Sequence, residues 1–297
     1  MTLTVTPQQA GRTIRSLLRY ELGMSTALLN HLKRREDGIL LNGSPAFTSA
    51  VLAAGDRLTV DLRDDLPEAP IPPIPMDLDI HYEDEFLLVI NKSAPLAVHA
   101  SSFSPEEPTL ANGLAHYLGP DLVFHPVNRL DRGTTGLMVV AKNRFAHNAL
   151  RRILHTGDFS REYRGICVGA PSPAAGVINL PIGRAEGSAI QRCIRADGAP
   201  AVTVYETMET VGGLTLLRLL PKTGRTHQLR LHMAAIGCPL AGDWLYGTED
   251  HSLISRPALH AWGLPSRHPV TGRQLSFQAA LPADLARLLQ KEYSRPG

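Results

Sequence analysis

Residues 125–136 read HPVNRLDRGTTG, a run that places one carboxylate, Asp131, between two arginines and ahead of a turn of small residues. Cationic neighbours favour the ionised form of a carboxylate, and an ionised carboxylate can act as a nucleophile. From His125 to Gly165 the chain has eight Lys and Arg against three Asp and Glu, although its total formal charge is only +2. An isolated Arg-x-Asp is more often a polar turn before a strand, so the prediction of a reactive carboxylate depends on other segments.

A second basic run, KTGRTHQLRLHMAAIG, covers residues 222–237. Leu229, His232, Met233 and Ile236 recur in it at helical spacing, between a Gly-Arg turn and a closing glycine, which predicts a helix. The three cations of this run are accompanied by no Asp or Glu. The sequence therefore holds two basic segments, of which the first contains the candidate carboxylate.

These two runs, with REYRGICVG at 161–169 between them, resemble the three ordered motifs of RluA-type pseudouridine synthases. The family's first motif usually reads His-Arg-Leu-Asp followed by Thr-Ser-Gly, and here NRLD at 128–131 and TTG at 134–136 replace His with Asn and Ser with Thr. The second motif, a tyrosine two residues after a basic residue, matches Tyr163. The third matches GRTHQLRLH at 224–232, and AGDWLYG at 241–247 is also similar to the family.

The resemblance implies a role for each of four residues in converting uridine to pseudouridine. Asp131 is the nucleophile, and Arg225 pairs with it and keeps it anionic and oriented. Tyr163 lies against the flipped base, with its oxygen near the C5 proton. Arg129 fills the space that the departed base leaves in the RNA. We therefore expect Asp131, Tyr163 and Arg225 to be catalytic and Arg129 to contact RNA.

The N-terminal residues 1–62 form a small module with expected helices over 10–20 and 25–34 and an Asn-Gly turn at 42–43. The segments 40–45 and 52–60 resemble the end of an S4-type RNA-binding domain. Its candidate RNA-binding residues are the cations Arg15, Arg19, Lys33, Arg34 and Arg35. Glu36 and Asp37 dilute this cluster, and an ordinary solvated helix face is the alternative interpretation.

Residues 63–76 contain five prolines and predict a stiff, extended linker to a catalytic domain over 77–297. Expected strands at 86–91, 137–141, 201–206 and 214–220 interleave with expected helices at 109–118, 146–155 and 282–292, and a hairpin turns at Gly272. The fold class predicted is α+β: a catalytic domain with a mixed, largely antiparallel sheet of the pseudouridine synthase type, and a small S4-like α/β module.

Composition excludes several other classes of protein. No run of about 18 apolar residues exists, and the first residues lack the basic start and apolar stretch of a signal peptide, so we expect no membrane span and a cytoplasmic protein. The three cysteines are widely spaced, and His227 and His232 are five residues apart, so we assign no metal. The isomerisation involves no redox change, and we expect no cofactor and a monomer.

The expected partner is structured RNA, with 23S ribosomal RNA preferred and transfer RNA as the alternative. Two other functions compete with this interpretation. A retaining glycosidase also attacks a sugar with a carboxylate, but it needs a second carboxyl group, and Asp121, Asp158 and Glu162 offer no persuasive pairing with Asp131. A non-catalytic RNA-binding protein or ribosome assembly factor would not need Asp131, Tyr163 and Arg225 together.

Overall fold

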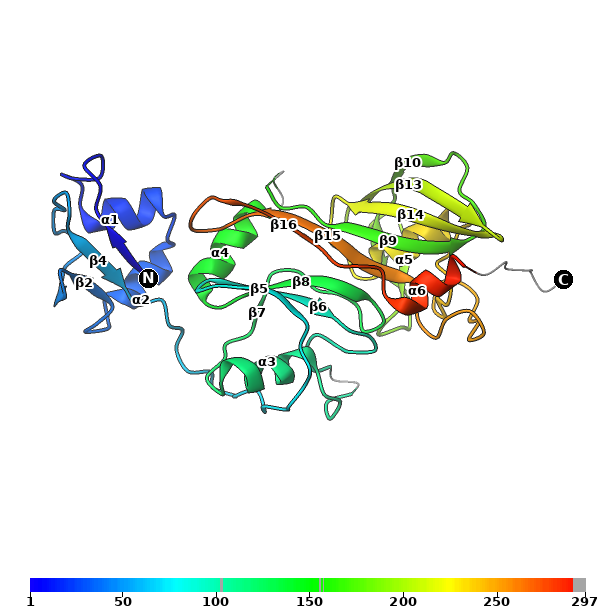
Figure 1. The fold of residues 1–297 in the computed structure, drawn as a ribbon, viewed down its shortest axis with the longest axis horizontal. Helices are drawn as coiled ribbons and strands as arrows, with labels where there is room; N and C mark the ends of the chain where they lie inside the picture. The colour runs from blue at the N-terminus through cyan, green and yellow to red at the C-terminus, as the bar shows by residue number, and fades with distance from the viewer. Residues whose placement is uncertain (102–103, 155, 157, 291–297) are drawn as a thin grey trace.

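A small N-terminal module and a larger domain built on one long sheet make up the protein (Figure 1). The structure is a computed structural model that describes residues 1–101, 104–154, 156 and 158–290. The module lies at one end of the long axis, next to helix α4 (Arg144–Ile153), and helix α6 (Ala283–Leu288) lies near the other end. The α+β class predicted from the sequence is confirmed.

The module combines a four-stranded sheet with two helical segments. Its strands are β1 (Thr2–Thr4), β2 (Ile39–Leu41), β3 (Ser44–Pro45) and β4 (Arg57–Val60), in the order β1-β4-β2-β3. Its helices are α1 (Ile14–Ser16), which continues as the π-helix η1 (Leu17–Glu21), and α2 (Thr26–Leu32). Helix α1 starts later than expected because Gly11 has φ +80° and Thr13 caps the first turn. Asn42 and Gly43 both have positive φ, which confirms the expected turn.

The larger domain is organised by a ten-stranded sheet. Its strands are β5 (Ile80–Glu83), β6 (Leu87–Lys92), β7 (His125–Pro126), β8 (Thr135–Ala141), β9 (Glu162–Val168), β10 (Ala175–Asn179), β13 (Val202–Val211), β14 (Leu214–Pro221), β15 (Leu259–Arg267) and β16 (Gln274–Gln278). The order is β10-β13-β14-β9-β15-β8-β6-β5, with β16 paired to β15 and β7 to β8. Strands β8 and β15 are parallel, and the other pairings described are antiparallel. The strands and the hairpin expected from the sequence are confirmed.

Helices α3 and α4 of this domain begin where the sequence places a capping residue. Helix α3 (Leu110–Leu118) begins after Thr109 with a capping box, and α4 begins after Asn143, whose side chain accepts a hydrogen bond from the backbone N–H of Ala146. Helix α5 (Gln228–Ala235) is the helix predicted in the second basic run. A separate hairpin pairs β11 (Ile182–Arg184) with β12 (Arg192–Ile194). His155 and residues 291–297, at the ends of two expected helices, lie outside the described residues.

Strand β15 aligns the two segments that carry the candidate catalytic residues. Ala261 pairs with Gly136 of β8 on one side and with Tyr163 of β9 on the other. The first motif, which leads into β8, and the second motif, which starts β9, therefore end at the same level of the sheet. Gly136 has φ +111°, and a Cβ atom there would lie 2.3 Å from the Ala261 carbonyl oxygen, so this position requires glycine.

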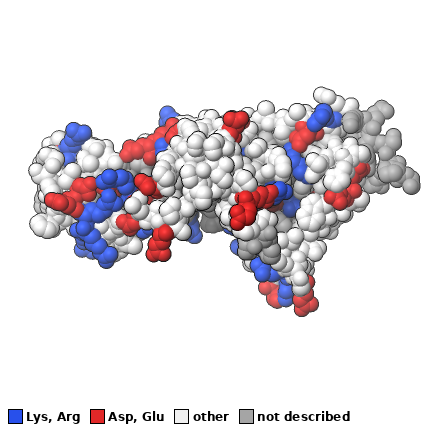
Figure 2. Space-filling view, turned by 90° about the horizontal axis from the view of Figure 1, so that it is seen from below, with Lys and Arg blue, Asp and Glu red and all other residues white. Residues whose placement is uncertain are grey.

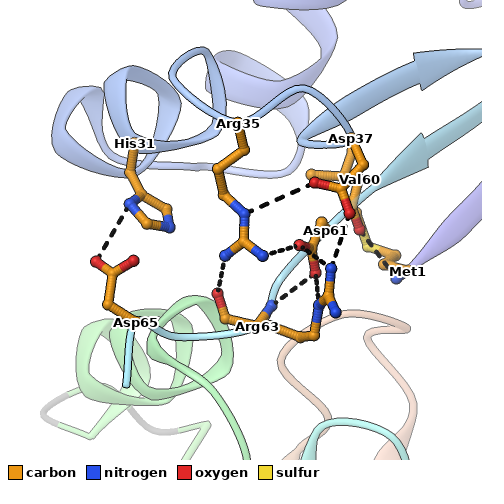
Figure 3. Close-up of polar contacts among 8 residues, drawn as sticks. All are labelled: Met1, His31, Arg35, Asp37, Val60, Asp61, Arg63 and Asp65. Carbon is orange, nitrogen blue, oxygen red and sulfur yellow. Dashed lines mark hydrogen bonds and ion pairs between the residues drawn. The ribbon is translucent and has the colours of Figure 1, made fainter. Parts of the chain in front are cut away.

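The segment 63–76 between the module and the larger domain contains no described helix or strand, and it is bonded at its start. Figure 3 shows Arg35 and Arg63 sharing the carboxylate of Asp61, with Arg63 also contacting Asp37 and His31 facing Asp65. On the other side, Asp64 accepts a hydrogen bond from His125 over 2.8 Å if that ring nitrogen is protonated. One cluster of buried apolar side chains also includes residues of both parts, such as Leu17 and Phe145.

Candidate active site

A cavity of about 760 Å³ opens where the first and third motifs meet the start of β9. Its walls come from residues 126–132, from Tyr163 and from residues 223–230. Three arginines line it in addition to those of the first motif: Arg161, Arg225 and Arg230. Asp131 is the single carboxylate among the described lining residues, so a negative charge is enclosed by positive ones.

Buried backbone contacts fix the loop that carries Asp131. Asn128 is buried, and its Oδ1 atom accepts a 2.8 Å hydrogen bond from the backbone N–H of Val139 in β8. The N–H of Thr134 donates to the carbonyl of Asp131, which closes the turn. The Asp131 side chain itself remains 29% exposed and reaches the cavity. Asn128, in place of the family's usual His, is therefore a loop anchor rather than a reacting group.

Arg230 is the arginine that pairs with Asp131. Its Nη1 lies 3.7 Å from Oδ2 of Asp131, while Nε and Nη2 donate to the two oxygens of Asp243, each over 2.7 Å. Asp243 is fully buried and also accepts from the backbone N–H groups of Leu245 and Tyr246. Burial lowers the pKa of the Arg230 guanidinium, but the hydrogen bonds and charge of Asp243 and the charge of Asp131 raise it above its ordinary value.

The predicted pairing of Arg225 with Asp131 is wrong. Nε of Arg225 donates to the carbonyl of Pro200 over 3.0 Å, at the exposed side of the cavity. Helix α5 starts only at Gln228, so Arg225 belongs to the loop ahead of it, whereas Arg230 lies on the buried helix. The third motif contains both arginines. Arg230 lies on the same core-facing helix as Leu229 and Met233, so its burial could have been expected from the sequence. A buried arginine needs an acidic partner, which would have distinguished Arg230 from Arg225.

The loop before α5 is held in an unusual conformation. Gln228 accepts from the Arg225 N–H and from the Thr223 hydroxyl, and its amide donates to the carbonyl of Val202. His227 has a left-handed φ of +57°, and its Nδ1 lies 2.9 Å from the hydroxyl of Tyr246. Non-glycine residues in this region store strain, and such strain clusters at active sites. The surrounding contacts therefore keep His227, a cavity-lining residue, in a defined position.

Tyr163 forms part of the cavity wall, as the resemblance implies, but most of its ring is in the core. It is 7% exposed and packs in the same apolar cluster as Leu130 and Leu229. Burial raises the pKa of its hydroxyl, the charge of Arg161 opposes this, and the charge of Asp131 adds to it. The described residues offer the hydroxyl no hydrogen-bond partner, so a substrate atom can take that place.

Lys92, at the end of β6, is a buried residue near the site that the sequence interpretation missed. It is 1% exposed, and its ammonium donates to the carbonyls of Ser93, Leu96 and Arg132 over 2.8, 2.8 and 3.4 Å. Burial lowers its pKa to about 7, while the charge of Asp131 acts in the opposite direction. Because Arg132 follows Asp131 in the chain, Lys92 ties the carboxylate loop to the sheet. No motif marked it, since its environment arises from tertiary contacts.

The structure divides the predicted RNA-binding residues into two groups. Arg129 is exposed on the cavity rim, and Arg15, Lys33 and Arg34 are exposed on the module without a described carboxylate within ion-pair distance. Arg35 does not fit the prediction: its guanidinium lies 2.6 Å from Asp61 and donates to the Arg63 carbonyl, so it secures the linker (Figure 3). Figure 2 shows that Lys and Arg gather over the module beside several acidic side chains.

The contacts of the remaining acids argue against a glycosidase. Glu162 bonds Arg164 and Arg218, and Asp158 pairs with Arg267, so neither faces Asp131. Asp243 is fully buried behind Arg230 and could not act as a second acid or base at a sugar.

Within the described part of the chain, no helix is long and apolar enough to cross a membrane.

The chain is similar to known RNA pseudouridine synthases. The family model described as RNA pseudouridylate synthase matches residues 86–235. The RNA pseudouridine synthase YjbO of Bacillus subtilis is 38% identical over 92% of this chain and 96% of its own, and ribosomal large subunit pseudouridine synthase D of Yersinia pestis is 40% identical over 73% and 71%. The structure of human RNA pseudouridylate synthase domain containing 1 has a TM-score of 0.57 at 27% identity, covering 69% of this chain and 83% of that one. The chain therefore belongs to the RluA-type family of RNA pseudouridine synthases, isomerases that act on RNA.

Proposed function

We propose that this enzyme isomerises uridine in 23S ribosomal RNA, with Asp131 as the reacting carboxylate. The observation that carries the proposal is the pair of Asp131 with Arg230 at the wall of a cavity of about 760 Å³. The choice of RNA is supported by the similarity to a protein named ribosomal large subunit pseudouridine synthase D. Transfer RNA is the second candidate, because phosphate contacts position a protein without specifying a sequence.

The reaction breaks the bond from ribose C1′ to base N1, turns the base, and forms a bond from C1′ to C5. The C5 proton leaves, and N1 gains a proton. A carboxylate serves this sequence by adding to C6, by adding to C1′, or by assisting formation of a glycal. In each route the target nucleotide has to leave its stack to reach the cavity. Asp131, exposed at 29%, is the carboxylate among the described lining residues that such a base can meet.

The surrounding residues supply orientation and proton transfer. Asp243 takes two nitrogens of Arg230, so the third is held toward Asp131 before the substrate arrives. Tyr163 presents the edge of a buried ring and a hydroxyl to which the described residues offer no partner, and both support a role against the base and near its C5 proton. Arg129 on the rim is suited to filling the gap that the base leaves. Arg225 is assigned to the RNA at the cavity mouth.

The N-terminal residues 1–62 serve recognition in this proposal, as an S4-like module. The exposed cations Arg15, Lys33 and Arg34 are available to phosphates, because no described carboxylate pairs with them. Residues 63–76 join the module to the catalytic domain over 77–297. The proposal keeps the expected monomer, and the isomerisation of uridine needs no cofactor.

Replacement of Asp131 by Asn tests the assignment. The amide keeps the shape and loses the charge, so we expect pseudouridine formation to fall below about a hundredth of the wild-type rate. Release of tritium from C5-labelled uridine in RNA measures the rate, and filter binding checks that RNA affinity is retained. A variant with higher activity would remove Asp131 from the chemistry, whereas a wild-type protein that forms no pseudouridine would favour the non-catalytic RNA-binding protein.

The target RNA needs a separate experiment. Carbodiimide primer extension in a deletion strain, across ribosomal and transfer RNA, maps the pseudouridines that disappear. Loss of a signal in 23S ribosomal RNA, restored by the wild-type gene and not by the Asp131→Asn gene, supports the proposal. Loss confined to transfer RNA would replace the substrate and leave the chemistry as proposed.

A further inference from the structure

A second hollow, of about 720 Å³, lies where the module meets α4. We call it the junction groove. The module contributes residues 19–20 and 23–26, and α4 contributes Asn148, Arg151 and Arg152. Its described lining contains three arginines and no Asp or Glu. The groove therefore has a local positive charge to which both parts of the protein contribute.

The cations of the junction groove are not neutralised by the protein. Arg19 donates to the hydroxyl of Thr26 over 2.7 Å, and Arg152 donates to the carbonyl of Gly23, so both are held by uncharged partners. Arg151 is exposed and has no described carboxylate within ion-pair distance. Nearby arginines differ: Arg12 pairs with Glu21 and Arg144 with Asp64. The positive charge is therefore concentrated in the groove itself.

An aromatic ring lies beside these cations. Tyr20 lines the groove and is 76% exposed, one of the most exposed large side chains in the protein. An exposed ring next to arginines is the usual combination for single-stranded nucleic acid, because the ring stacks on a base while the cations contact phosphates. A partner protein with an acidic surface is the alternative occupant, since Tyr and Arg are also enriched at protein interfaces, and RNA binding by groove variants distinguishes the two.

Helix α4 connects the junction groove to the catalytic cavity. Asn148 lines the groove, and Leu154, the C-cap residue that follows α4, lines the cavity. Six residues of helix span about 9 Å. In double-stranded DNA the phosphates of one strand follow each other every 3.4 Å or so along the axis, which sets the scale for a nucleic-acid strand. An RNA strand that places its uridine in the cavity thus reaches the groove within a few nucleotides.

We propose that the junction groove binds the substrate RNA a few nucleotides from the target uridine, with Arg19, Arg151 and Arg152 on phosphates and Tyr20 on an unpaired base. This proposal rests on the proposed function, since it requires an RNA substrate. It extends the binding surface from the module to the catalytic domain. RNA in the groove bridges the two parts and stabilises their arrangement.

Two single substitutions separate charge from stacking. Arg151→Gln removes a cation that holds no described carboxylate, and Tyr20→Leu removes the ring without a change of charge. The probe is a 23S ribosomal RNA transcript, and filter binding over a series of KCl concentrations gives the dissociation constant and its salt dependence. Arg287→Gln, an exposed arginine on α6 far from the groove, is the matched control.

We expect Arg151→Gln to raise the dissociation constant several-fold and to reduce the log-log salt slope by about 0.7 to 0.9, the contribution of one phosphate contact. Tyr20→Leu should raise the dissociation constant and keep the slope, because stacking releases no counterions. Arg287→Gln should behave as wild type in binding and turnover.

Two results would overturn the junction groove as an RNA site. The first is wild-type affinity and slope in both groove variants, which would leave a protein partner as the alternative occupant. The second is an equal effect of Arg151→Gln and Arg287→Gln, which would indicate general surface charge. Failure of the proposed function is separate, since it appears as absence of pseudouridine formation by the wild-type enzyme.

Discussion

Arg230 and Asp131 form an ion pair in which only one of the two partners is held rigidly. The guanidinium is 6% exposed and bound on two nitrogens by Asp243, whereas the Asp131 carboxylate is 29% exposed and lies 3.7 Å from the remaining nitrogen. A planar fork can bind one carboxylate bidentately and present another edge to a second. The carboxylate is therefore oriented by a fixed cation while it stays accessible from the cavity.

The two arginines of the third motif should respond differently to substitution. We expect Arg230→Met to lose nearly all activity, because an uncompensated Asp243 remains buried and Asp131 loses its partner. Arg230→Lys should retain only a trace, since an ammonium cannot serve both carboxylates in the same geometry. Arg225→Met should mainly raise KM, because Arg225 bonds only a carbonyl at the exposed side. Tritium release over a range of RNA concentrations measures kcat and KM.

Thermal unfolding serves as the control for this comparison. Arg230→Met removes a buried charge pair, so a lower Tm is expected, and the residual activity has to be measured well below it. Loss of kcat in Arg225→Met with intact kcat in Arg230→Lys would contradict the assignment and restore Arg225 as the partner of Asp131.

Removal of the Tyr163 hydroxyl tests its chemical role separately from the packing of its ring. Tyr163→Phe keeps the ring in the core and removes the hydroxyl, for which the described residues offer no partner, so stability should change little. We expect kcat to fall by about 10²-fold or more, in the range of one acid–base group, with RNA affinity unchanged. Single-turnover measurement of tritium release tests this, and wild-type kcat in the Phe variant would reduce Tyr163 to a core residue.

Lys92 should give the free energy of unfolding a pH dependence. Burial lowers its pKa to about 7 from the ordinary 10.5. Between these values the unfolded chain carries a proton on Lys92 that the folded chain has lost, so this residue's contribution to stability rises with pH over that window. Urea unfolding of wild type and Lys92→Met from pH 7 to 9 should show the difference shifting in favour of wild type. Parallel pH profiles would mean that Lys92 keeps its proton in the fold.

The sequence predicted many of the elements and the location of the candidate site because local signals carry that information. Capping residues such as Asn143 act through the backbone near them, and the first motif marked Asp131 as the candidate reactive carboxylate. The motifs also located the cavity wall at Tyr163. These features need few long-range contacts.

The pairings within the site needed the tertiary structure. Asp243 follows Arg230 by thirteen residues and reaches it only after a helix and a turn, and Lys92 meets Arg132 across forty residues. The motif alone does not distinguish its two arginines, Arg225 and Arg230. Their different burial in the folded protein does. The role of Arg35 also depends on the tertiary structure. Folding of the module brings Asp61 next to the Arg35 guanidinium, and this ion pair secures the linker.

Tyr246 should affect activity through His227. Its hydroxyl contacts Nδ1 of His227 and accepts from the backbone N–H of Arg192, each over 2.9 Å. Tyr246→Phe leaves these groups unpaired, which we expect to cost about 1–2 kcal/mol of stability. Because His227 is held at a strained φ, its position in the cavity should relax and lower kcat several-fold. Chemical denaturation and tritium release measure the two effects, and an unchanged kcat would confine Tyr246 to packing.

Removal of the module tests its role in recognition, and the structure decides where to cut. A chain that begins at Pro75 loses the contacts of Asp64 with His125 and of Pro72 with Asn112, so the cut belongs before Asp64. We expect the chain 64–297 to fold with lower stability, because part of an apolar cluster is uncovered. It should bind RNA more weakly and with a salt slope shallower by about 0.7 to 0.9 per lost phosphate contact, while turnover at saturating RNA falls far less.

The full-length Lys33→Gln, Arg34→Gln double variant is the control for folding, since it should reproduce part of the slope change without exposing the cluster. Equal affinity and slope for the shortened and full-length proteins would show that the module does not touch the substrate, and its surface would then be assigned to contacts with another protein.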